Sequence, residues 1–205
     1  MCINRHPPQP TTSLRTYYYY LLSNFRVHQS TSLSNKMAQQ VAQKHMVEQY
    51  GPYGSQCPEN YSFKLQEGES IKEVIVRYGY IVDAIGFVVA KPCGGTYTKM
   101  FGGNDCRAKE SRIVLKCGEK ITKISGVYGN YKYQDNQCTI ASIKFHTNLC
   151  PPGYGPYGQV DGVECPRTFT SPCSLDGPIV GVFGRHNNYL ESVGIFVQKK
   201  DCPCA

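Results

Sequence analysis

A five-residue segment that occurs twice constrains the fold of this chain more than any other feature. Tyr50-Gly51-Pro52-Tyr53-Gly54 returns unchanged as Tyr154-Gly155-Pro156-Tyr157-Gly158, and Phe101-Gly102-Gly103 lies midway between the two copies. A period of roughly 50 residues indicates that one supersecondary unit is used several times. We therefore expect three copies of a unit that begins with a glycine-rich turn.

Each copy also contains a predicted β-hairpin. Within these hairpins apolar residues alternate with other residues, and a period of two places the apolar side chains on one face of a strand. The alternating runs are Val74, Val76 and Tyr78; Ile85, Phe87 and Val89; and Val193, Ile195 and Val197. A unit of about four short strands cannot bury such a face alone, whereas three units around a common axis can. The sequence therefore predicts an all-β domain made of three sheets.

The composition changes near residue 47 and divides the chain into three parts. Residues 1–46 are polar and lack periodicity, so we expect a disordered N-terminal extension, or an untranslated stretch if Met37 or Met46 is the true start. Residues 47–198 form the predicted domain, and residues 199–205 form a cysteine-containing tail. Much of the net charge of +7 belongs to the extension, which has five basic residues and no acidic one. A basic folded surface is therefore not predicted, which argues against nucleic-acid binding.

Other classes of site and location are constrained by cysteine, histidine and hydropathy patterns. The chain has 11 cysteines, of which all but Cys2 lie after residue 56, and this hints at disulfides and secretion. The N-terminus, however, makes a poor signal peptide, which favours a cytoplasmic or nuclear location with secretion as the alternative. No C-x-x-C occurs and His146 and His186 lack ligand spacing, so we expect no metal and no cofactor. No apolar run is long enough for a membrane span.

In their order and spacing, these motifs resemble the jacalin-related lectins. The resemblance rests on the two Tyr-Gly-Pro-Tyr-Gly segments, Gly79-Tyr80-Ile81-Val82-Asp83, Phe101-Gly102-Gly103, Ile124-Ser125-Gly126-Val127-Tyr128-Gly129 and Ile179-Val180-Gly181-Val182-Phe183-Gly184-Arg185. It implies a β-prism I fold, with three four-stranded Greek-key sheets in pseudo-threefold symmetry. It also implies non-catalytic binding of mannose- or glucose-type glycans or glycoproteins by a homo-oligomer.

The resemblance implies a first sugar site at Gly79-Tyr80-Ile81-Val82-Asp83, an intact G-x-x-x-D loop, with Gly102 and Gly103 as its companion. A carboxylate accepts hydrogen bonds from adjacent sugar hydroxyls, and glycine lets backbone approach the ligand closely. We expect the Asp83 carboxylate to face solvent, so that Asp83→Ala would remove binding without unfolding the protein. The alternative is purely structural, with Gly79 as a turn and Asp83 as a cap.

The family's principal site aligns with Asn187-Asn188-Tyr189-Leu190-Glu191, where the sequence departs from the motif. Asn187 replaces glycine, which asparagine's tolerance of positive φ permits, and Glu191 is one methylene longer than aspartate. Cys57-Pro58 stands where two glycines are usual, and proline lacks a donor. Asn187, Asn188, Tyr189 and Glu191 are thus candidate ligand residues in a site that is impaired, reshaped or inactive. The middle hairpin, Gly129 to Ile140, lacks the motif and is expected to be a structural loop.

Three functions follow, of which a lectin is favoured. A protein-interaction or structural module that has lost sugar binding is the alternative, supported by Cys57-Pro58 and Glu191. A glycosidase would need two carboxylates about 5–10 Å apart across a cleft, and Asp83 with Glu191 is the best pair. Because these acids belong to separate loops, we expect no catalysis.

Overall fold

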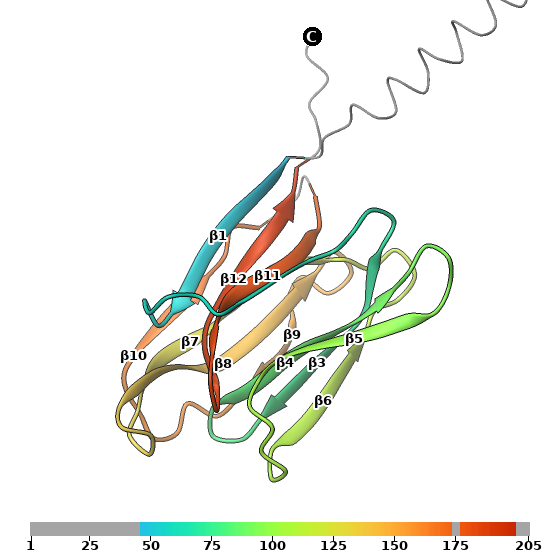
Figure 1. Ribbon diagram of the computed structural model, residues 1–205. Helices are drawn as coiled ribbons and strands as arrows, with labels where there is room; N and C mark the ends of the chain where they lie inside the picture. Colours follow the sequence, from blue (N-terminus) through green and yellow to red (C-terminus); the bar gives the residue numbers. More distant parts are fainter. Residues whose placement is uncertain (1–45, 174–176, 200–205) are drawn as a thin grey trace, which may run out of the picture. The chain divides into compact units, whose positions relative to one another are not determined.

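The computed structural model describes residues 46–173 and 177–199, which form twelve β-strands in three four-stranded sheets (Figure 1). The predicted N-terminal extension, apart from Met46, and the tail after Lys199 lie outside the described residues. The first sheet contains β1 (Val47–Gly54), β2 (Tyr61–Lys64), β11 (Ile179–His186) and β12 (Leu190–Gln198). The second contains β3 (Ser70–Tyr78), β4 (Val82–Ala90), β5 (Thr96–Gly102) and β6 (Lys109–Val114). The third contains β7 (Ile121–Tyr131), β8 (Gln137–Thr147), β9 (Tyr154–Tyr157) and β10 (Val163–Thr170).

Every sheet has Greek-key order. The second sheet runs β5-β4-β3-β6 and the third β10-β7-β8-β9, so that the fourth strand of each returns beside its first strand. The first sheet runs β1-β12-β11-β2. It has the same order when β11 counts as the first strand, β12 as the second, β1 as the third and β2 as the fourth, as if the two ends of the domain were joined. In Figure 1, β1 and β12 lie side by side, and the Lys199 amide donates to the Met46 carbonyl over 2.8 Å. The three-sheet prism predicted from the repeat and the family resemblance is confirmed.

The repeated glycines occupy equivalent positions in the three sheets. Gly54 and Gly102 end the third strand of their Greek keys, Gly158 directly follows the third strand of its own, and all three have positive φ. A Cβ atom at these glycines would lie 2.4 Å, 2.2 Å and 2.1 Å from the carbonyl oxygens of Glu191, Asp83 and Ala141, respectively. Only glycine permits this approach of two backbones. The repeat is therefore a packing requirement, and it identifies Glu191, Asp83 and Ala141 as equivalent residues.

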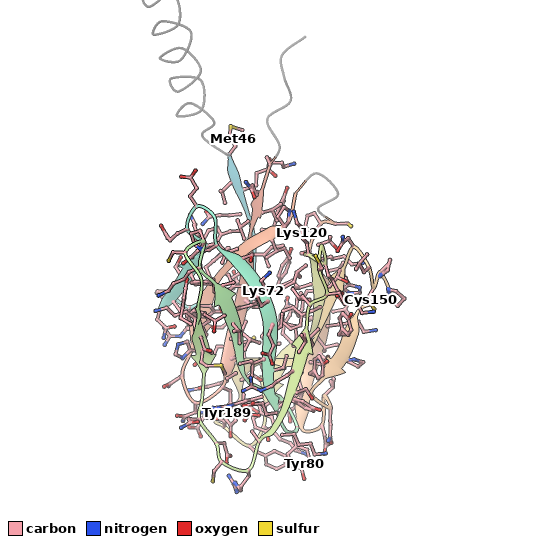
Figure 2. All side chains as sticks on the ribbon, turned by 90° about the vertical axis from the view of Figure 1, so that its right-hand side faces the viewer. Met46, Lys72, Tyr80, Lys120, Cys150 and Tyr189 are labelled. Carbon is pink, nitrogen blue, oxygen red and sulfur yellow. The ribbon has the colours of Figure 1, made fainter. Side chains whose placement is uncertain are left out.

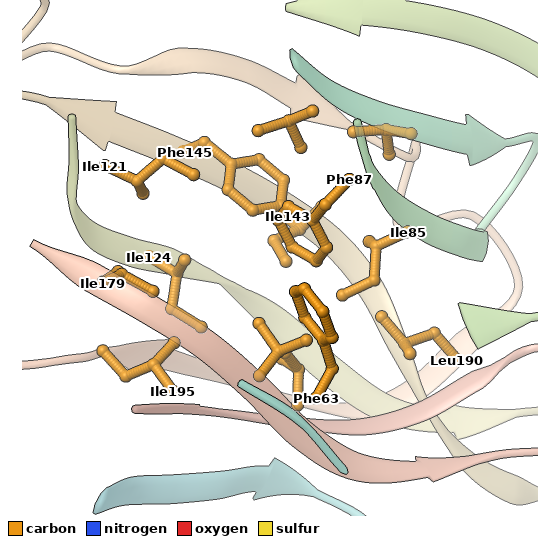
Figure 3. Packing of buried hydrophobic residues seen from close by; sticks show 14 of the residues in the cluster. Phe63, Ile85, Phe87, Ile121, Ile124, Ile143, Phe145, Ile179, Leu190 and Ile195 are labelled. Atoms are coloured by element: carbon orange, nitrogen blue, oxygen red, sulfur yellow. The ribbon is translucent and has the colours of Figure 1, made fainter. Parts of the chain in front are cut away.

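The core lies between the three sheets and uses the apolar faces that the period of two predicts. Ile85 of β4, Ile143 of β8 and Ile195 of β12 are fully buried, one from each sheet (Figure 3). Phe63 of the first sheet meets Phe87 of the second, with ring centroids 6.2 Å apart. Each such side chain contributes about 1.5–3 kcal/mol on burial, which makes this cluster the main source of stability.

The described residues carry free thiols and hold no cluster of metal ligands. The cysteine count hinted at disulfides, but the described residues contain none. Their eight cysteines are free thiols: Cys57, Cys93, Cys106, Cys117, Cys138, Cys150, Cys165 and Cys173. Within the same residues, no group of three or more histidine, cysteine, aspartate or glutamate side chains is placed to hold a metal ion. No helix there has the length and apolarity to span a membrane.

Candidate functional site

The hairpin loops that connect β3 to β4 and β11 to β12 lie at the same end of the prism. Figure 2 shows Tyr80 of the first loop and Tyr189 of the second together at this end, with Met46 at the opposite end. Each loop is closed by a tight backbone hydrogen bond, from the Gly79 amide to Ile81 and from the Asn187 amide to Tyr189. Neither Gly79 nor Asn187 has positive φ. Asn187 therefore does not adopt the left-handed conformation that its alignment with a glycine suggested.

The structure brings the G-x-x-x-D loop and its glycine companion together. Ala84 pairs with Gly102 across β4 and β5, and the Gly103 amide donates to the Asp83 carbonyl over 2.9 Å. However, protein backbone fills the room that these glycines leave. A Cβ atom at Gly103 would lie only 1.8 Å from the carbonyl oxygen of Asn188. Both glycines therefore allow the loops to pack against one another, and neither lines the pocket beside Asp83.

The Asp83 side chain is buried, contrary to the expectation that its carboxylate faces solvent. Only 5% of the residue is exposed, and its Oδ2 atom has no hydrogen-bond partner among the described residues. Burial raises the pKa of Asp83 to about 6, with a further rise from nearby Asp105, while the backbone amides of Asp83 and Gly79 oppose the change. Its two preceding residues have different surroundings. Val82 belongs to the buried core, whereas Ile81 is buried and lines the pocket.

A pocket of about 480 Å³ opens beside Asp83. Its lining comes from all three sheets and consists of Gly79, Tyr80, Ile81, Asp83, Asp105, Arg107, Ala108, Tyr131, Tyr133, Asp161 and Tyr189. Tyr131 and Tyr133 belong to the middle hairpin, so this hairpin, expected to be a structural loop, contributes two side chains to the pocket lining. The structure thus gathers Gly79, Tyr80, Ile81 and Asp83 with Tyr189 from the other candidate loop, whereas Val82, Gly102, Gly103, Asn187, Asn188 and Glu191 do not line the pocket.

Four tyrosines form an aromatic wall along the pocket. The Tyr131 ring is perpendicular to Tyr133 and to Tyr189, with centroid distances of 5.5 Å and 5.8 Å. Tyr131 is buried, and this burial raises the pKa of its hydroxyl, with smaller effects from Tyr189 and Tyr133. Tyr80 and Tyr133 are 55% and 66% exposed. Large aromatic rings that remain open to solvent at a concave site are available to a ligand.

The mouth of the pocket carries charge of both signs. Arg107 donates to both carboxylate oxygens of Asp105, with an ion-pair distance of 2.9 Å, and the hydrogen bond holds the pKa of Asp105 below its usual range. The ionised Asp105 in turn disfavours the ionised form of Asp83. Asp161, from the loop between β9 and β10, is exposed at the same pocket. Polar groups therefore converge on the aromatic wall.

The other candidate carboxylate, Glu191, forms an ion pair within the protein. The residue is 7% exposed, and its Oε2 atom accepts a hydrogen bond from Arg185 Nε over 2.8 Å. The same arginine donates to the Pro58 carbonyl over 3.0 Å, which joins the altered Cys57-Pro58 turn to this ion pair. Because Glu191 does not reach the pocket of Asp83, the two acids do not form a catalytic pair there.

Sequence reasoning missed Asp105, Arg107, Tyr131, Tyr133 and Asp161 as pocket residues. Two signals were present in the sequence. Asp105 and Arg107 follow closely after Gly102-Gly103, and Tyr131-Lys132-Tyr133 places two aromatic rings in a loop. Neither signal predicts the direction in which a loop folds across the end of the prism. That direction depends on contacts between sheets, such as the hydrogen bond from the Gln159 amide to the Tyr80 carbonyl.

Comparisons with known proteins agree with this architecture. Residues 39–196 match the family described as the Jacalin-like lectin domain. A mannose/glucose-specific lectin from Parkia pendula is 33% identical over 151 residues, which cover 72% of this chain and 31% of that lectin. The jacalin-related lectin Calsepa from Calystegia sepium is 31% identical over 155 residues, or 73% of this chain and 94% of Calsepa.

The structural likeness extends over the same region. The crystal structure of Calystegia sepium agglutinin gives a TM-score of 0.63 at 29% sequence identity, with 76% of this chain and 98% of the agglutinin covered. The artocarpin–mannotriose complex, at 20% identity and a TM-score of 0.62, shares the fold. The family match covers well over half of the sequence, and the chain belongs to the Jacalin-like lectin domain family.

Proposed function

We propose that this chain is a non-catalytic lectin whose pocket at Asp83 binds mannose- or glucose-type sugars. The observation that carries the proposal is the Asp83 Oδ2 atom, a buried carboxylate oxygen at the pocket without a hydrogen-bond partner among the described residues. A buried acceptor without a partner is unfavourable by roughly 1–3 kcal/mol, and more when it is charged. A ligand hydroxyl that donates to this atom would offset that loss.

The chemistry of the pocket suits a sugar ring. A sugar presents hydroxyls at its edge and C–H groups on its faces, and the pocket presents a carboxylate beside the exposed rings of Tyr80 and Tyr133. Hydrogen bonds to an ionised carboxylate are about twice as strong as neutral ones, and aromatic rings pack against the apolar face. We expect a single sugar to bind with a dissociation constant on the order of 1 mM, which corresponds to about 4 kcal/mol.

The named relatives support the same class of ligand. The Parkia pendula protein is called a mannose/glucose-specific lectin, and Calsepa has been crystallised in complex with a biantennary N-glycan. Because this chain spans only 31% of the length of the Parkia lectin, the specificity of that protein supports the proposal and does not replace an experiment.

The test is a calorimetric titration of the full chain with methyl α-D-mannoside and methyl α-D-glucoside, compared with the Asp83→Asn variant. We expect the variant to bind about 10–100-fold more weakly, because it loses a charge-assisted hydrogen bond worth about 1.5–3 kcal/mol. The matched control is Glu67→Gln, which removes an exposed carboxylate from the loop between β2 and β3. Equal affinity of Asp83→Asn and the parent protein would refute the assignment of this pocket.

A protein-interaction module is the second candidate, and one observation favours it. At the loop equivalent to the family's principal site, Arg185 pairs with Glu191 Oε2, and a sugar would have to compete with this ion pair for the carboxylate. If neither sugar binds the parent protein at millimolar concentrations and a glycan array is also negative, this alternative replaces the lectin proposal. The predicted homo-oligomer, which would raise avidity for multivalent glycans, stays a prediction for light scattering to test.

A further inference from the structure

We propose that a second pocket, at the opposite end of the prism, binds a small amphipathic anion, with its acidic group near Lys72, Lys116 and Lys120. This pocket has a volume of about 310 Å³. Figure 2 shows Lys120 in the half of the domain toward Met46, away from Tyr80. The inference goes beyond the proposed function, because it assigns another site and another class of ligand.

The wall of the second pocket is apolar and follows the pseudo-threefold symmetry. Ile71, Ile121 and Ile179 lie at the beginning of β3, β7 and β11, and all three line the pocket. They are equivalent, since each is the last paired residue before a register shift in its hairpin. Leu65 and Leu115, from two connections between sheets, extend the wall. Such a wall favours the burial of hydrocarbon over that of a hydroxyl-rich sugar.

The two pockets lie at opposite ends of the same strands. The second pocket is lined by the first residues of β3, β7 and β11, whereas the hairpin loops of the first pocket follow the last residues of these strands. Its volume lies near the lower limit of small-molecule sites, which is about 300 Å³. The apolar body of the ligand is therefore limited to one short hydrocarbon chain or one small ring system.

Two equivalent turns at this end each contribute a glutamate to the pocket lining. The turns are closed by hydrogen bonds of 3.0 Å from the Glu69 amide to the Gln66 carbonyl and from the Glu119 amide to the Lys116 carbonyl. Each glutamate carboxylate also accepts a hydrogen bond from the first amide of its turn, over 2.8 Å at Gln66 and 2.9 Å at Lys116. The carboxylates are thus engaged by the turns that carry them.

Further donors complete the coordination of both carboxylates. Glu69 accepts a hydrogen bond from the Tyr97 hydroxyl over 2.9 Å, and Glu119 accepts two, from Thr147 over 2.6 Å and from Tyr154 over 2.8 Å. Burial favours the neutral form of Glu119, but its hydrogen bonds hold the pKa of the carboxyl below its usual range. Because both acids have partners within the protein, the pocket has no need of a cationic ligand.

The lysines of the pocket, in contrast, are available to an anion. The side chains of Lys72, Lys116 and Lys120 are exposed, and all three residues line the pocket. Among the residues that the structure describes, none of the three forms an ion pair. Each ammonium group offers three hydrogen-bond donors, and positive charge around an apolar hollow attracts an acidic group. The geometry therefore suits a short-chain carboxylate.

The experiment varies the charge of the ligand while the apolar body stays the same. Octanoate, 1-octanol and octylammonium are titrated calorimetrically into the full chain at low ionic strength. We expect octanoate to bind about tenfold more tightly than octanol and octylammonium to bind most weakly, because several weak charge pairs add to the same apolar contact. Hexanoate should bind about tenfold more weakly than octanoate, since it lacks two methylene groups that the pocket buries.

Variants of the lysines locate the site. The combined change Lys72→Gln, Lys116→Gln and Lys120→Gln should remove the tenfold preference for octanoate over octanol. The matched control lowers the net charge equally by changing to glutamine three exposed lysines outside the pocket lining: Lys91, Lys99 and Lys109. The control should keep the preference. An equal loss in both triple variants, or equal affinities of the parent protein for the three eight-carbon ligands, would show that no anion site exists here.

The apolar wall is tested separately with Leu65→Gln, which should weaken octanoate and octanol by a similar factor. Unchanged affinities in the folded variant would contradict the assigned wall, and if the variant does not fold, the lysine triple decides alone. Absence of octanoate binding to the parent protein at about 10 mM would also overturn the proposal. Asp83→Asn should keep the octanoate affinity, so that this site and the proposed sugar site fail independently.

Discussion

Asp83 and Glu191 occupy equivalent positions, but Glu191 is held by an arginine, whereas Asp83 Oδ2 is buried without a hydrogen-bond partner among the described residues. Each acid follows a hairpin loop. Arg77 pairs across its hairpin with the residue after Asp83, and Arg185 pairs in the same way with the residue after Glu191. Arg185 turns to Glu191 at 2.8 Å, whereas Arg77 turns away to Glu110 at 2.9 Å. The carboxylate of Glu191 is therefore engaged within its own hairpin, while Asp83 lies beside the pocket and the arginine of its hairpin pairs with another strand.

The raised pKa of Asp83 makes stability and binding depend on pH in opposite directions. Its folded-state pKa of about 6 lies above the ordinary value of 3.8, so the folded state keeps a proton that the unfolded state releases between about pH 4 and pH 6. The free energy of unfolding should therefore fall as pH rises through this window, by up to about 3 kcal/mol. Sugar affinity should rise over the same window, because the ionised carboxylate is the stronger acceptor.

Urea denaturation and calorimetric titration at intervals from about pH 4.5 to pH 7.5 would measure both trends. Asp83→Asn cannot ionise at this position, so its stability should lack the part of the pH dependence that Asp83 causes in the parent protein. An unchanged pH profile in that variant would show that other groups control the titration.

At the scale of the strand, aromatic rings cover glycines in the sheets. Gly194 of β12 lies under Phe183 of β11, and a Cβ atom at Gly194 would be 2.3 Å from the ring. Phe183 also packs on Phe196, with ring centroids 4.8 Å apart, so it has little room to move. The glycine is needed here for space, since its φ does not lie in the left-handed region.

Gly194→Ala should lower the free energy of unfolding by about 1–3 kcal/mol, which is typical of an added methyl group in a packed interior. Urea denaturation of the full chain would measure the change. Gly79→Ala is the matched control, because the nearest atom to its Cβ would be Asp83 Oδ2 at 3.9 Å, an ordinary contact. Equal stability of the two variants would mean that the Phe183 ring moves aside without loss.

The sequence was sufficient to predict strands β3, β4 and β12, because a local alternation of apolar residues marks each of them. Alternation around Val74 and Val76 or Ile85 and Phe87 identifies the buried face, and those side chains are buried. The repeated glycine segments indicated equivalent positions correctly, but they were expected to be turns and instead lie in or directly after strands β1, β5 and β9. The direction of Tyr131 and Tyr133, in contrast, depends on packing between loops of different sheets, which no local pattern encodes. The burial of Asp83, which is 5% exposed beside the loops that line the pocket, was missed for the same reason.

At the scale of the whole domain, the first sheet is built from segments far apart in the sequence. Strands β1 and β2 come from the start of the domain and pair with β12 and β11 from its end. The pocket loops then combine all three sheets, so the site depends on closure of the prism. The Greek-key order of the first sheet would be continuous if residues 199 and 46 were joined, which their hydrogen bond of 2.8 Å makes feasible.

A circular permutant tests whether chain continuity matters at that junction. A short glycine linker would join Lys199 to Met46, and new ends would open between Cys93 and Gly94, in an exposed turn between β4 and β5 that does not line the pocket. We expect folding and sugar affinity within about twofold of an unpermuted chain of residues 46–199, because exposed turns tolerate new termini. A second permutant opened between Tyr80 and Ile81 should fold but lose binding, since that cut divides the pocket loop. Circular dichroism and mannoside titration would separate the two effects, and failure of the first permutant to fold would mean that the connection between β4 and β5 is needed to assemble the second sheet.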